Sequence, residues 1–214
     1  MKISKRHQHS GLALIECTWF KHSDVSLRPL IYTATQMFDD GPLSFHYEMA
    51  NSRVALFEAL DRVIRMREIK YVYIASHGSS GELECYNGDV VSIADLIGKL
   101  SFALDTRGVS LTGLHLSACS FGSRENLQKI LNSVPKLSWI SGYSEEVDWL
   151  GSASLDMQFI YHLLKYDEPT PAQQIKVVTD NLTGHLAGAI SDFGFSVLLR
   201  TGKTVSDLFD REKR

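Results

Sequence analysis

Residues 71–78, YVYIASHG, and residues 111–119, LTGLHLSAC, contain the two strands that decide the fold and the candidate site. Each run is short, rich in apolar residues and typical of a buried parallel strand. The first strand leads into His77 and the second into Cys119. A single crossover between them favours neighbouring strands, whose carboxyl ends meet at one edge of the sheet. We therefore expect an imidazole and a thiol in one crevice.

The residues around these strands alternate between predicted strands and predicted helices. Asn87-Gly88 is a strong hairpin signal, and Ser92 then caps a helix. A further helix begins near Ser123, and residues 137–142, LSWISG, form the next strand. A polar loop and a helix with an inward apolar face follow. This alternation predicts right-handed crossovers and a mostly parallel, doubly wound α/β sheet.

The two ends of the chain show weaker patterns. Residues 11–20 and 43–50 are predicted strands, with the turn signal DDGP between them at 39–42. After the core pattern ends, a helix is expected over 172–190 and a strand over 193–200. These segments agree with the α/β architecture but carry no motif that points to a reaction.

The composition bounds the class of protein and its partners. With 214 residues, 44% of them hydrophobic, and a net charge of −3, the chain is sized for one domain with a short appendage. The charge gives no reason to expect nucleic acid, and no apolar run approaches the length that crosses a membrane. Glu16 interrupts the apolar stretch that a signal peptide would need. The three cysteines are widely spaced, so a reducing, cytoplasmic setting is expected.

The surroundings of both reactive residues suit nucleophilic catalysis. Cys119 precedes a helix, whose positive end favours a thiolate. His77 is placed to take the thiol proton and to return it to the leaving amine. The backbone N–H groups of Gly78 and Cys119 would then form the oxyanion hole. The alternative, an inert core cysteine and a loop histidine, stays open, and Cys17 and Cys85 are expected to be apolar fillers of that kind.

Strand-His-Gly followed by strand-Ser-Ala-Cys resembles the signature of the caspase-like (clan CD) cysteine peptidases, the group of caspases, separases, gingipains and legumains. Within that group the sequence is similar to the CHAT branch, whose caspase-like domains are common in bacteria. Three segments carry this resemblance, IASHGSSGELECYNGDVVSIADLIGKL at 74–100, LHLSACSFG at 114–122 and WISGYSEEVDWLGSASLDMQFIYHLL at 139–164. It covers about residues 70–165, and the middle segment is its most specific part.

The resemblance implies a three-layer α-β-α caspase-like sandwich with a mostly parallel central sheet. It places the peptidase core in residues 1–168 and leaves 169–214 as a C-terminal extension packed on that core, frayed at its charged end, 207–214. It also implies a cysteine endopeptidase that forms an acyl-enzyme at Cys119 with His77 as the base. Neither a third catalytic carboxylate, a cofactor nor a metal is expected.

The same resemblance implies residues that bind the substrate. Ser117 lies where relatives line the pocket for the residue that precedes the scissile bond. The loop before the last core helix supplies the other wall, with Glu145, Glu146 and Asp148, and Asp148 matches the acidic position of the CHAT pattern. Acidic lining favours arginine or lysine in the substrate. The alternative is that these carboxylates cap the helix from Leu150 and face water.

The turn after Cys119 departs from the family pattern, which often has Glu-Thr-Gly at this place. This chain has Ser120, Phe121 and Gly122 instead. An exposed Phe121 could line a pocket or a partner interface, or it could pack on the following helix. Substrate access depends on which of these holds, whereas catalysis does not.

The catalytic fold would nearly fill the chain and leave little room for a sensor. We therefore expect a protein substrate and a separately encoded activating partner or sensor, with a role in bacterial defence. Direct binding to nucleic acid or to a membrane is not expected. The alternative from a different class is a catalytically silent caspase-like scaffold that binds partners. The presence of both His77 and Cys119 weighs against that alternative.

Overall fold

The computed structural model describes residues 11–38, 43–105, 108–166 and 168–209. Its centre is a seven-stranded sheet with the strand order β10-β9-β8-β7-β3-β1-β2. The strands from β8 to β2 in that order run parallel, whereas β9 is antiparallel to β8 and β10 is antiparallel to β9. The bounds are β1 (Gly11–Glu16), β2 (Phe45–Met49), β3 (Ile69–Ala75), β7 (Gly113–Ser117), β8 (Trp139–Tyr143), β9 (Phe195–Thr201) and β10 (Thr204–Asp207).

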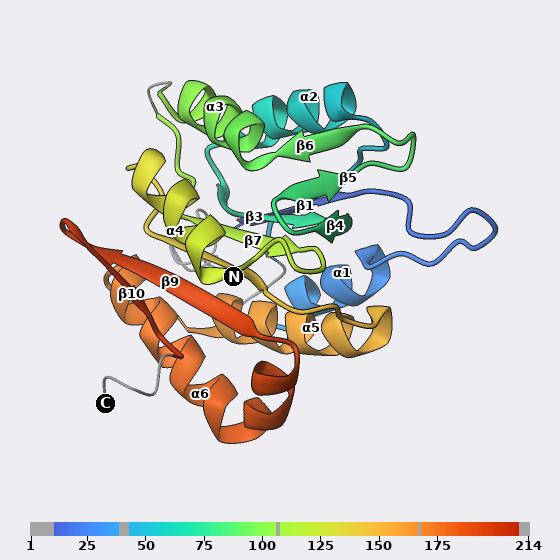
Figure 1. Ribbon diagram of the computed structural model, residues 1–214. Coiled ribbons are helices and arrows are strands. Elements are labelled where there is room, and N and C mark those ends of the chain that lie inside the picture. The colour runs from blue at the N-terminus through green and yellow to red at the C-terminus, as the bar shows by residue number, and fades with distance from the viewer. Residues whose placement is uncertain (1–10, 39–42, 106–107, 167, 210–214) are drawn as a thin grey trace, which may run out of the picture.

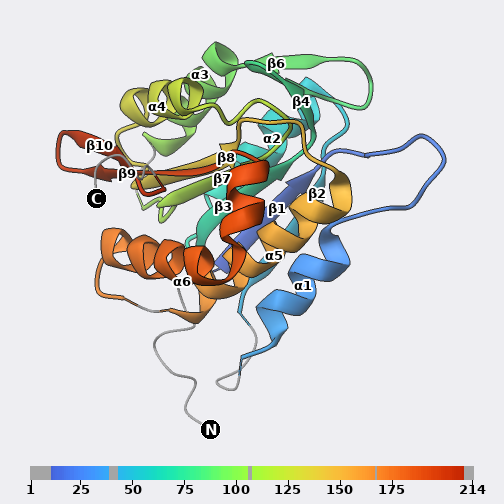
Figure 2. The same cartoon turned by 60° about the horizontal axis from the view of Figure 1, so that its bottom comes forward.

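Helices cover both faces of this sheet and complete a three-layer sandwich (Figure 1). One face carries α2 (Arg53–Ile64), α3 (Ile93–Leu104) and α4 (Arg124–Ser133). The other face carries α1 (Arg28–Gln36), α5 (Trp149–Lys165) and α6 (Pro171–Asp192), which lie together in Figure 2. The expected α-β-α fold class with a mostly parallel central sheet is therefore confirmed.

The side chains of β3 alternate between the two cores on either face of the sheet. Val72 and Ile74 belong to the core that includes α2, α3 and α4. Tyr71, Tyr73 and Ala75 belong to the core that includes α1, α5 and α6. A strand that is buried on both faces has no polar side, and this is why the sequence shows a continuous apolar run here.

A second sheet, with three antiparallel strands, follows β3 and carries the predicted hairpin. Its strands are β4 (His77–Ser79), β5 (Glu82–Glu84) and β6 (Val90–Ser92). Gly88, in the turn between β5 and β6, has a φ of 89°, which residues with a side chain rarely adopt. Ser92 caps α3 as predicted, and Asp95 completes a capping box with it.

Two features near the N-terminal side differ from the prediction. The strand expected over 11–20 ends at Glu16, and α1 occupies residues that the sequence leaves unassigned. This helix is rich in β-branched and aromatic side chains, which are weak helix formers. Burial of Ile31 and Ala34 on the side that faces α5 outweighs that local preference. The turn expected at 39–42 lies outside the described residues.

The C-terminal residues extend the central sheet. The predicted helix over 172–190 is α6, and the predicted strand over 193–200 is β9, which pairs with β8. The strand β10 is not predicted from the sequence, and it forms a hairpin with β9 around Gly202, whose φ is 62°. The N–H of Leu208 donates to the carbonyl of Val197, so the segment expected to fray is attached as far as it is described.

The predicted boundary at residue 168 falls between α5 and α6, and residues on both sides of it contribute strands to one sheet. Along the parts of the chain that the structure describes, no helix has the length and apolar character that would let it cross a membrane.

A test of the packing concerns Gly122, in the turn that leads from β7 to α4. A β-carbon at this position would lie 2.3 Å from the backbone nitrogen of Tyr143, on β8. We expect Gly122→Ala to lower the free energy of unfolding by roughly 1–3 kcal/mol, because the turn must move away from the sheet. The control is Gly98→Ala on the exposed side of α3, where nothing lies within 4 Å of a new β-carbon.

Chemical denaturation of both variants makes this comparison. Gly98→Ala is expected to stabilise the protein by up to about 1 kcal/mol, because alanine favours a helix over glycine. Equal stabilities of Gly122→Ala and the unchanged chain would contradict the close approach of the turn to β8.

Candidate active site

The carboxyl ends of β3 and β7 bring the candidate site together. Ala75 and Ser117 are register partners at the ends of these strands, and the N–H of Ser76 donates to the Ser117 carbonyl at 3.2 Å. His77 and Cys119 follow from this point. Gly78 is needed here, because a β-carbon on it would lie 2.8 Å from that of Ala118 and 3.1 Å from the carbonyl oxygen of Cys119.

His77 and Cys119 line one cavity of about 260 Å³. The neighbouring Ser117, which the sequence analysis assigns to substrate binding, lines it too. The remaining lining residues are largely apolar or aromatic, and they come from the loop after β1, the ends of β3 and β7, and the beginning of α5. They are Trp19, Phe20, Ser76, Ala118, Val147, Trp149 and Ser152.

The backbone of Trp19 orients the imidazole of His77. The Nε2 atom of His77 lies 2.8 Å from the Trp19 carbonyl oxygen. Because a carbonyl only accepts hydrogen bonds, this contact places the proton on Nε2 and leaves the lone pair of Nδ1 to accept a proton in the neutral ring. The rings of Trp19 and Phe20 also meet the imidazole edge-on, at centroid distances of 5.3 Å and 6.3 Å.

A buried carboxylate holds the loop that presents Trp19. Glu16 is fully buried and accepts hydrogen bonds from the Trp19 indole at 2.7 Å, from the Ser26 hydroxyl at 2.6 Å and from the Leu27 N–H at 2.7 Å. The hydroxyl of Tyr47, on β2, donates to it at 3.1 Å. Glu16 and Trp19 are not predicted as site residues, although a glutamate within an apolar strand indicates that its carboxylate needs partners.

The turn after Cys119 is held in an unusual backbone conformation. The thiol of Cys119 donates to the Val147 carbonyl at 3.6 Å. Ser120 follows with a φ of 54°, in the left-handed region that residues other than glycine seldom occupy. Its N–H donates to the Glu145 carbonyl at 3.0 Å, and the N–H of Gly122 donates to the Tyr143 carbonyl at 2.7 Å. The surrounding hydrogen bonds therefore fix a strained turn beside the thiol.

Phe121 packs on the helix that follows it, which is one of the roles that the sequence leaves open. Its side chain is fully buried in the core with α4, and its carbonyl accepts a hydrogen bond from the Asn126 side chain at 3.0 Å. Phe121 is not among the cavity residues. It therefore anchors the turn to α4 instead of forming a surface for substrate or partner.

A second buried carboxylate, Asp156 on α5, lies beneath the cavity. It accepts hydrogen bonds from the hydroxyls of Ser117, at 2.7 Å, Tyr143, at 2.5 Å, and Tyr73. The Nε2 atom of His115 contacts it at 2.7 Å. Burial alone raises the pKa of Asp156, but the contact with His115 and the hydroxyl donors outweighs this, and the net pKa lies below the usual value.

This polar cluster is also absent from the sequence-based site. Neither His115 nor Asp156 is predicted as a site residue, yet their contacts join β3, β7 and β8 to α5 below Ser117. Ser152 and Asp156 are one turn apart on the buried side of α5. Two polar residues at this spacing on an apolar helix face are the sequence signal that could have indicated a buried polar cluster.

The predicted acidic wall lies outside the cavity lining. Asp148 is the N-cap of α5, and its carboxylate accepts the Gly151 N–H at 2.7 Å. This is the capping role that the sequence analysis names as the alternative. Glu146 is exposed, and Val147, between the two acidic residues, is the residue that reaches the cavity. A role of Glu146 or Asp148 in substrate binding stays a prediction.

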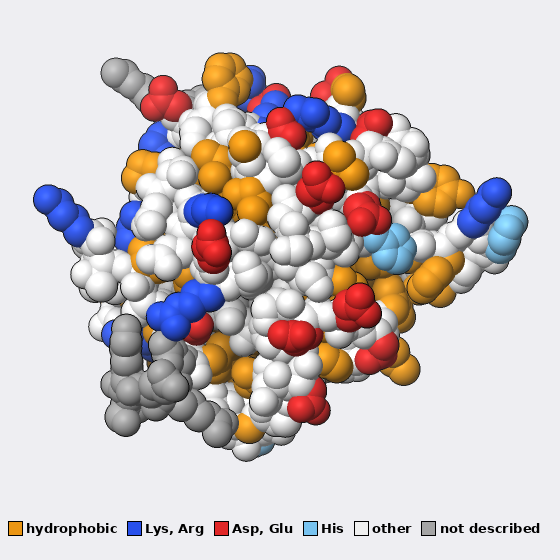
Figure 3. All heavy atoms as spheres, in the orientation of Figure 1, with side chains coloured by type: hydrophobic (Ala, Val, Ile, Leu, Met, Phe, Trp, Pro, Cys, Tyr) orange, Lys and Arg blue, Asp and Glu red, His pale blue; other side chains and the backbone are white. Residues whose placement is uncertain are grey.

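Carboxylates nevertheless flank the cavity on two sides. Figure 3 shows acidic side chains over the small sheet and over the segment that leads into α5, around a histidine. We call these exposed residues the acidic rim, which consists of Glu82, Glu84, Glu145, Glu146 and Asp148. Glu84 pairs with His77 across β4 and β5. In the described part of the chain, no group of three or more His, Cys, Asp and Glu side chains is placed to hold a metal ion.

Replacing Asp156 tests its part in the fold beneath the site. In Asp156→Asn the amide nitrogen would face hydroxyl donors, so we expect the free energy of unfolding to fall by about 3–5 kcal/mol, as when one partner of a buried pair is removed. Urea denaturation measures this loss. The control is Asp192→Asn at the exposed end of α6, which we expect to change stability by less than about 0.5 kcal/mol.

The pH dependence gives an independent check on the charge of Asp156. Its pKa is lowered in the folded state, so it contributes stability above its unfolded pKa of about 3.9, and this contribution is lost as the pH falls through the folded value. Asp156→Asn should therefore lose less stability on acidification than the unchanged chain. An identical acid dependence of both proteins would contradict an ionised Asp156.

A comparison with solved structures agrees with this architecture, whereas comparisons of the sequence find no match. No family model and no curated protein matches the sequence. The structure is similar to the crystal structure of caspase-1 from Spodoptera frugiperda, with a TM-score of 0.50 and 14% sequence identity, over 80% of this chain and 75% of that chain. At this level of identity the likeness concerns the fold alone. The chain has a caspase-like α/β fold, with a mostly parallel seven-stranded sheet between two layers of helices.

Proposed function

We propose that this protein is a cysteine endopeptidase in which Cys119 is the nucleophile and His77 is its base. The observation that carries the proposal is the shared cavity: a thiol and an imidazole follow the ends of two paired parallel strands and line one hollow of a caspase-like fold. A nucleophile and a base that converge on one cavity are the minimum for acyl transfer.

In the proposed reaction, residues of this cavity take part in each step of peptide hydrolysis. With Nε2 held by Trp19, the Nδ1 atom of His77 takes the proton of the Cys119 thiol as the sulfur attacks the substrate carbonyl. The oxyanion accepts hydrogen bonds from the N–H groups of Gly78 and Cys119. The intermediate collapses, the amine leaves with the proton from His77, and water then hydrolyses the acyl-enzyme.

The proposal includes a preference for arginine or lysine before the scissile bond. The walls beside Cys119, from Ala118, Val147 and Trp149, suit the aliphatic stem of such a side chain. Its charged end would approach the hydroxyl of Ser117, which donates to the ionised Asp156 below. The acidic rim adds a negative field at the mouth of the cavity, which favours cationic segments of a protein substrate.

Regulation and biological setting belong to the same proposal. The activity of the cavity would be switched on by a separate protein partner or sensor. The assignment to the CHAT branch, and with it a role in bacterial defence in the cytoplasm, rests on the three segments that resemble that branch.

Active-site labelling tests the nucleophile and its base. We expect an acyloxymethyl ketone with a peptidyl arginine to label the unchanged chain and not Cys119→Ala. His77→Ala should be labelled at least about 100-fold more slowly, which is the lower range for loss of a general base. The control is His22→Ala, an exposed histidine outside the cavity, which should be labelled at the rate of the unchanged chain.

Two results would contradict this assignment. Labelling that persists in Cys119→Ala would place the nucleophile elsewhere. A chain that stays unlabelled, also with candidate partners from its own cell extract added, would favour the catalytically silent scaffold.

Cleavage of short fluorogenic peptides tests the preference for a basic residue. With arginine, lysine, leucine or aspartate before the scissile bond, we expect kcat/KM to be at least about tenfold higher for the two basic residues, because a charge-assisted hydrogen bond contributes roughly 1.5–3 kcal/mol. This ratio should fall with added salt as the acidic rim is screened.

A double variant distinguishes the contribution of the acidic rim to the preference for basic peptides from the contribution of the cavity. Glu84→Gln with Glu146→Gln should reduce the preference for basic peptides and its salt dependence, whereas Glu58→Gln, an exposed residue on α2, should change neither. A preference for leucine or aspartate in the unchanged chain would contradict a cation-binding cavity and leave the assignment of Cys119 standing.

A further inference from the structure

Cys17 and Cys85 are two buried, free cysteines that the proposed reaction does not use. Cys17 follows β1 and begins the loop that leads to α1. This loop extends away from the body of the molecule in both ribbon views (Figures 1 and 2). Cys85 follows β5 and begins the turn to β6. The fold brings these two separate segments into contact.

Asn51 connects the two cysteine-bearing segments. Its side-chain oxygen accepts the Thr18 N–H at 2.7 Å, and its backbone carbonyl accepts the Asn87 N–H at 3.1 Å. The carbonyl of the preceding Ala50 accepts the thiol of Cys17 at 2.8 Å. Residues next to both cysteines are therefore fixed to one point of the chain, just before α2.

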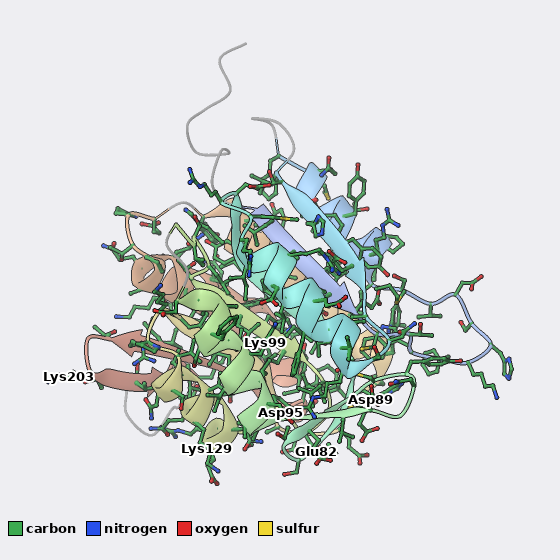
Figure 4. All side chains as sticks on the ribbon, turned by 90° about the horizontal axis from the view of Figure 1, so that it is seen from above. Glu82, Asp89, Asp95, Lys99, Lys129 and Lys203 are labelled. Carbon is green, nitrogen blue, oxygen red and sulfur yellow. The ribbon has the colours of Figure 1, made fainter. Side chains whose placement is uncertain are left out.

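Asp89 fixes the turn that carries Cys85. Its carbonyl accepts the Cys85 N–H at 2.8 Å, and its carboxylate accepts hydrogen bonds from the Asn87 side chain and from the Arg53 N–H. Figure 4 shows Asp89 beside the N-terminal end of α2. The backbone position of Cys85 is thus fixed by the contacts of Asp89 and does not depend on the Cys85 thiol.

Cys17 and Cys85 belong to the same cluster of packed, buried side chains, where their thiols are neighbours. The hydrogen bond between them, together with burial, raises the pKa of Cys17, and the same hydrogen bond lowers the pKa of Cys85. The sulfur of Cys85 therefore has the greater thiolate character of the two. A thiolate that can be oxidised beside a second thiol that can resolve the product is the arrangement of redox-sensitive cysteines.

We propose that Cys17 and Cys85 form an intramolecular disulfide when the protein meets a hydroperoxide, and that this bond ties the loop bearing Trp19 to the sheet bearing His77. With hydrogen peroxide, the Cys85 thiolate attacks one oxygen, the O–O bond breaks, and a sulfenic acid and hydroxide form. The Cys17 sulfur then attacks the sulfenic sulfur, the S–O bond breaks, and the hydroxyl leaves as water with the Cys17 proton. The two thiols lose two electrons, and the peroxide gains them.

The proposed cross-link lies close in sequence to the two residues that position His77, which are Trp19 and Glu84. Trp19, whose carbonyl contacts Nε2 of His77, lies two residues after Cys17. Glu84, which pairs with His77 across β4 and β5, lies directly before Cys85. A bond between the cysteines limits the movement of these two supports relative to each other. The inference does not depend on Cys119 acting as a nucleophile.

Peptide mapping of the oxidised full-length chain tests the proposal. The three cysteines fall in three different tryptic peptides, 7–21, 71–99 and 108–124, so each possible pair gives a distinct cross-linked mass. After hydrogen peroxide treatment and alkylation of the remaining thiols, we expect the link between 7–21 and 71–99 to be the main product. It should disappear after reduction with dithiothreitol and persist in Cys119→Ser.

Thermal unfolding provides a second measurement on the same samples. A disulfide that closes a long loop should raise the Tm of the oxidised chain by roughly 5–15 °C over the reduced chain. Cys17→Ser and Cys85→Ser should show no such difference between oxidised and reduced samples.

Two outcomes would overturn the proposal. One is a main cross-link that includes peptide 108–124. The other is recovery of Cys17 and Cys85 as alkylated thiols, after unfolding, from samples in which Cys119 is already oxidised.

Discussion

The parallel pairing of β3 with β7 is the constraint on which the candidate site depends. Ala75 and Ser117 end these strands as partners, so the residues that follow them start from one point. β3 contributes side chains to the cores on both faces of the sheet, whereas β7 contributes Leu114 and Leu116 to one core and directs His115 and Ser117 to Asp156 on the other face. Since a shift of register would exchange the side chains of these faces, the packing of both helical layers fixes where the thiol and the imidazole emerge.

Two buried carboxylates shape the cavity from below its surface. Glu16 gathers the loop that presents Trp19, and Asp156 gathers hydroxyl and imidazole groups from β3, β7 and β8. A buried carboxylate without partners is costly, so each one requires its surrounding segments to adopt a single arrangement. The positions of the cavity walls therefore depend on two carboxylates that are not themselves among the residues lining the cavity.

The sequence predicts what depends on local signals. The apolar runs of β3 and β7, the turn at Gly88 and the cap at Ser92 are readable from neighbouring residues, and together they place His77 near Cys119. The contact of Trp19 with His77 joins residues 58 positions apart, and no local pattern announces it. The helix α1 escapes prediction for a related reason, because packing overrides weak helix propensity.

His77 belongs to the small sheet, whereas Cys119 follows a strand of the central one. The described strands of the two sheets form no common ladder, and the chain passes from one to the other at Ser76. The relative position of base and nucleophile therefore depends on how the two sheets pack against each other, and Leu83 and Val91 of the small sheet belong to the same core as the apolar side chains of β7.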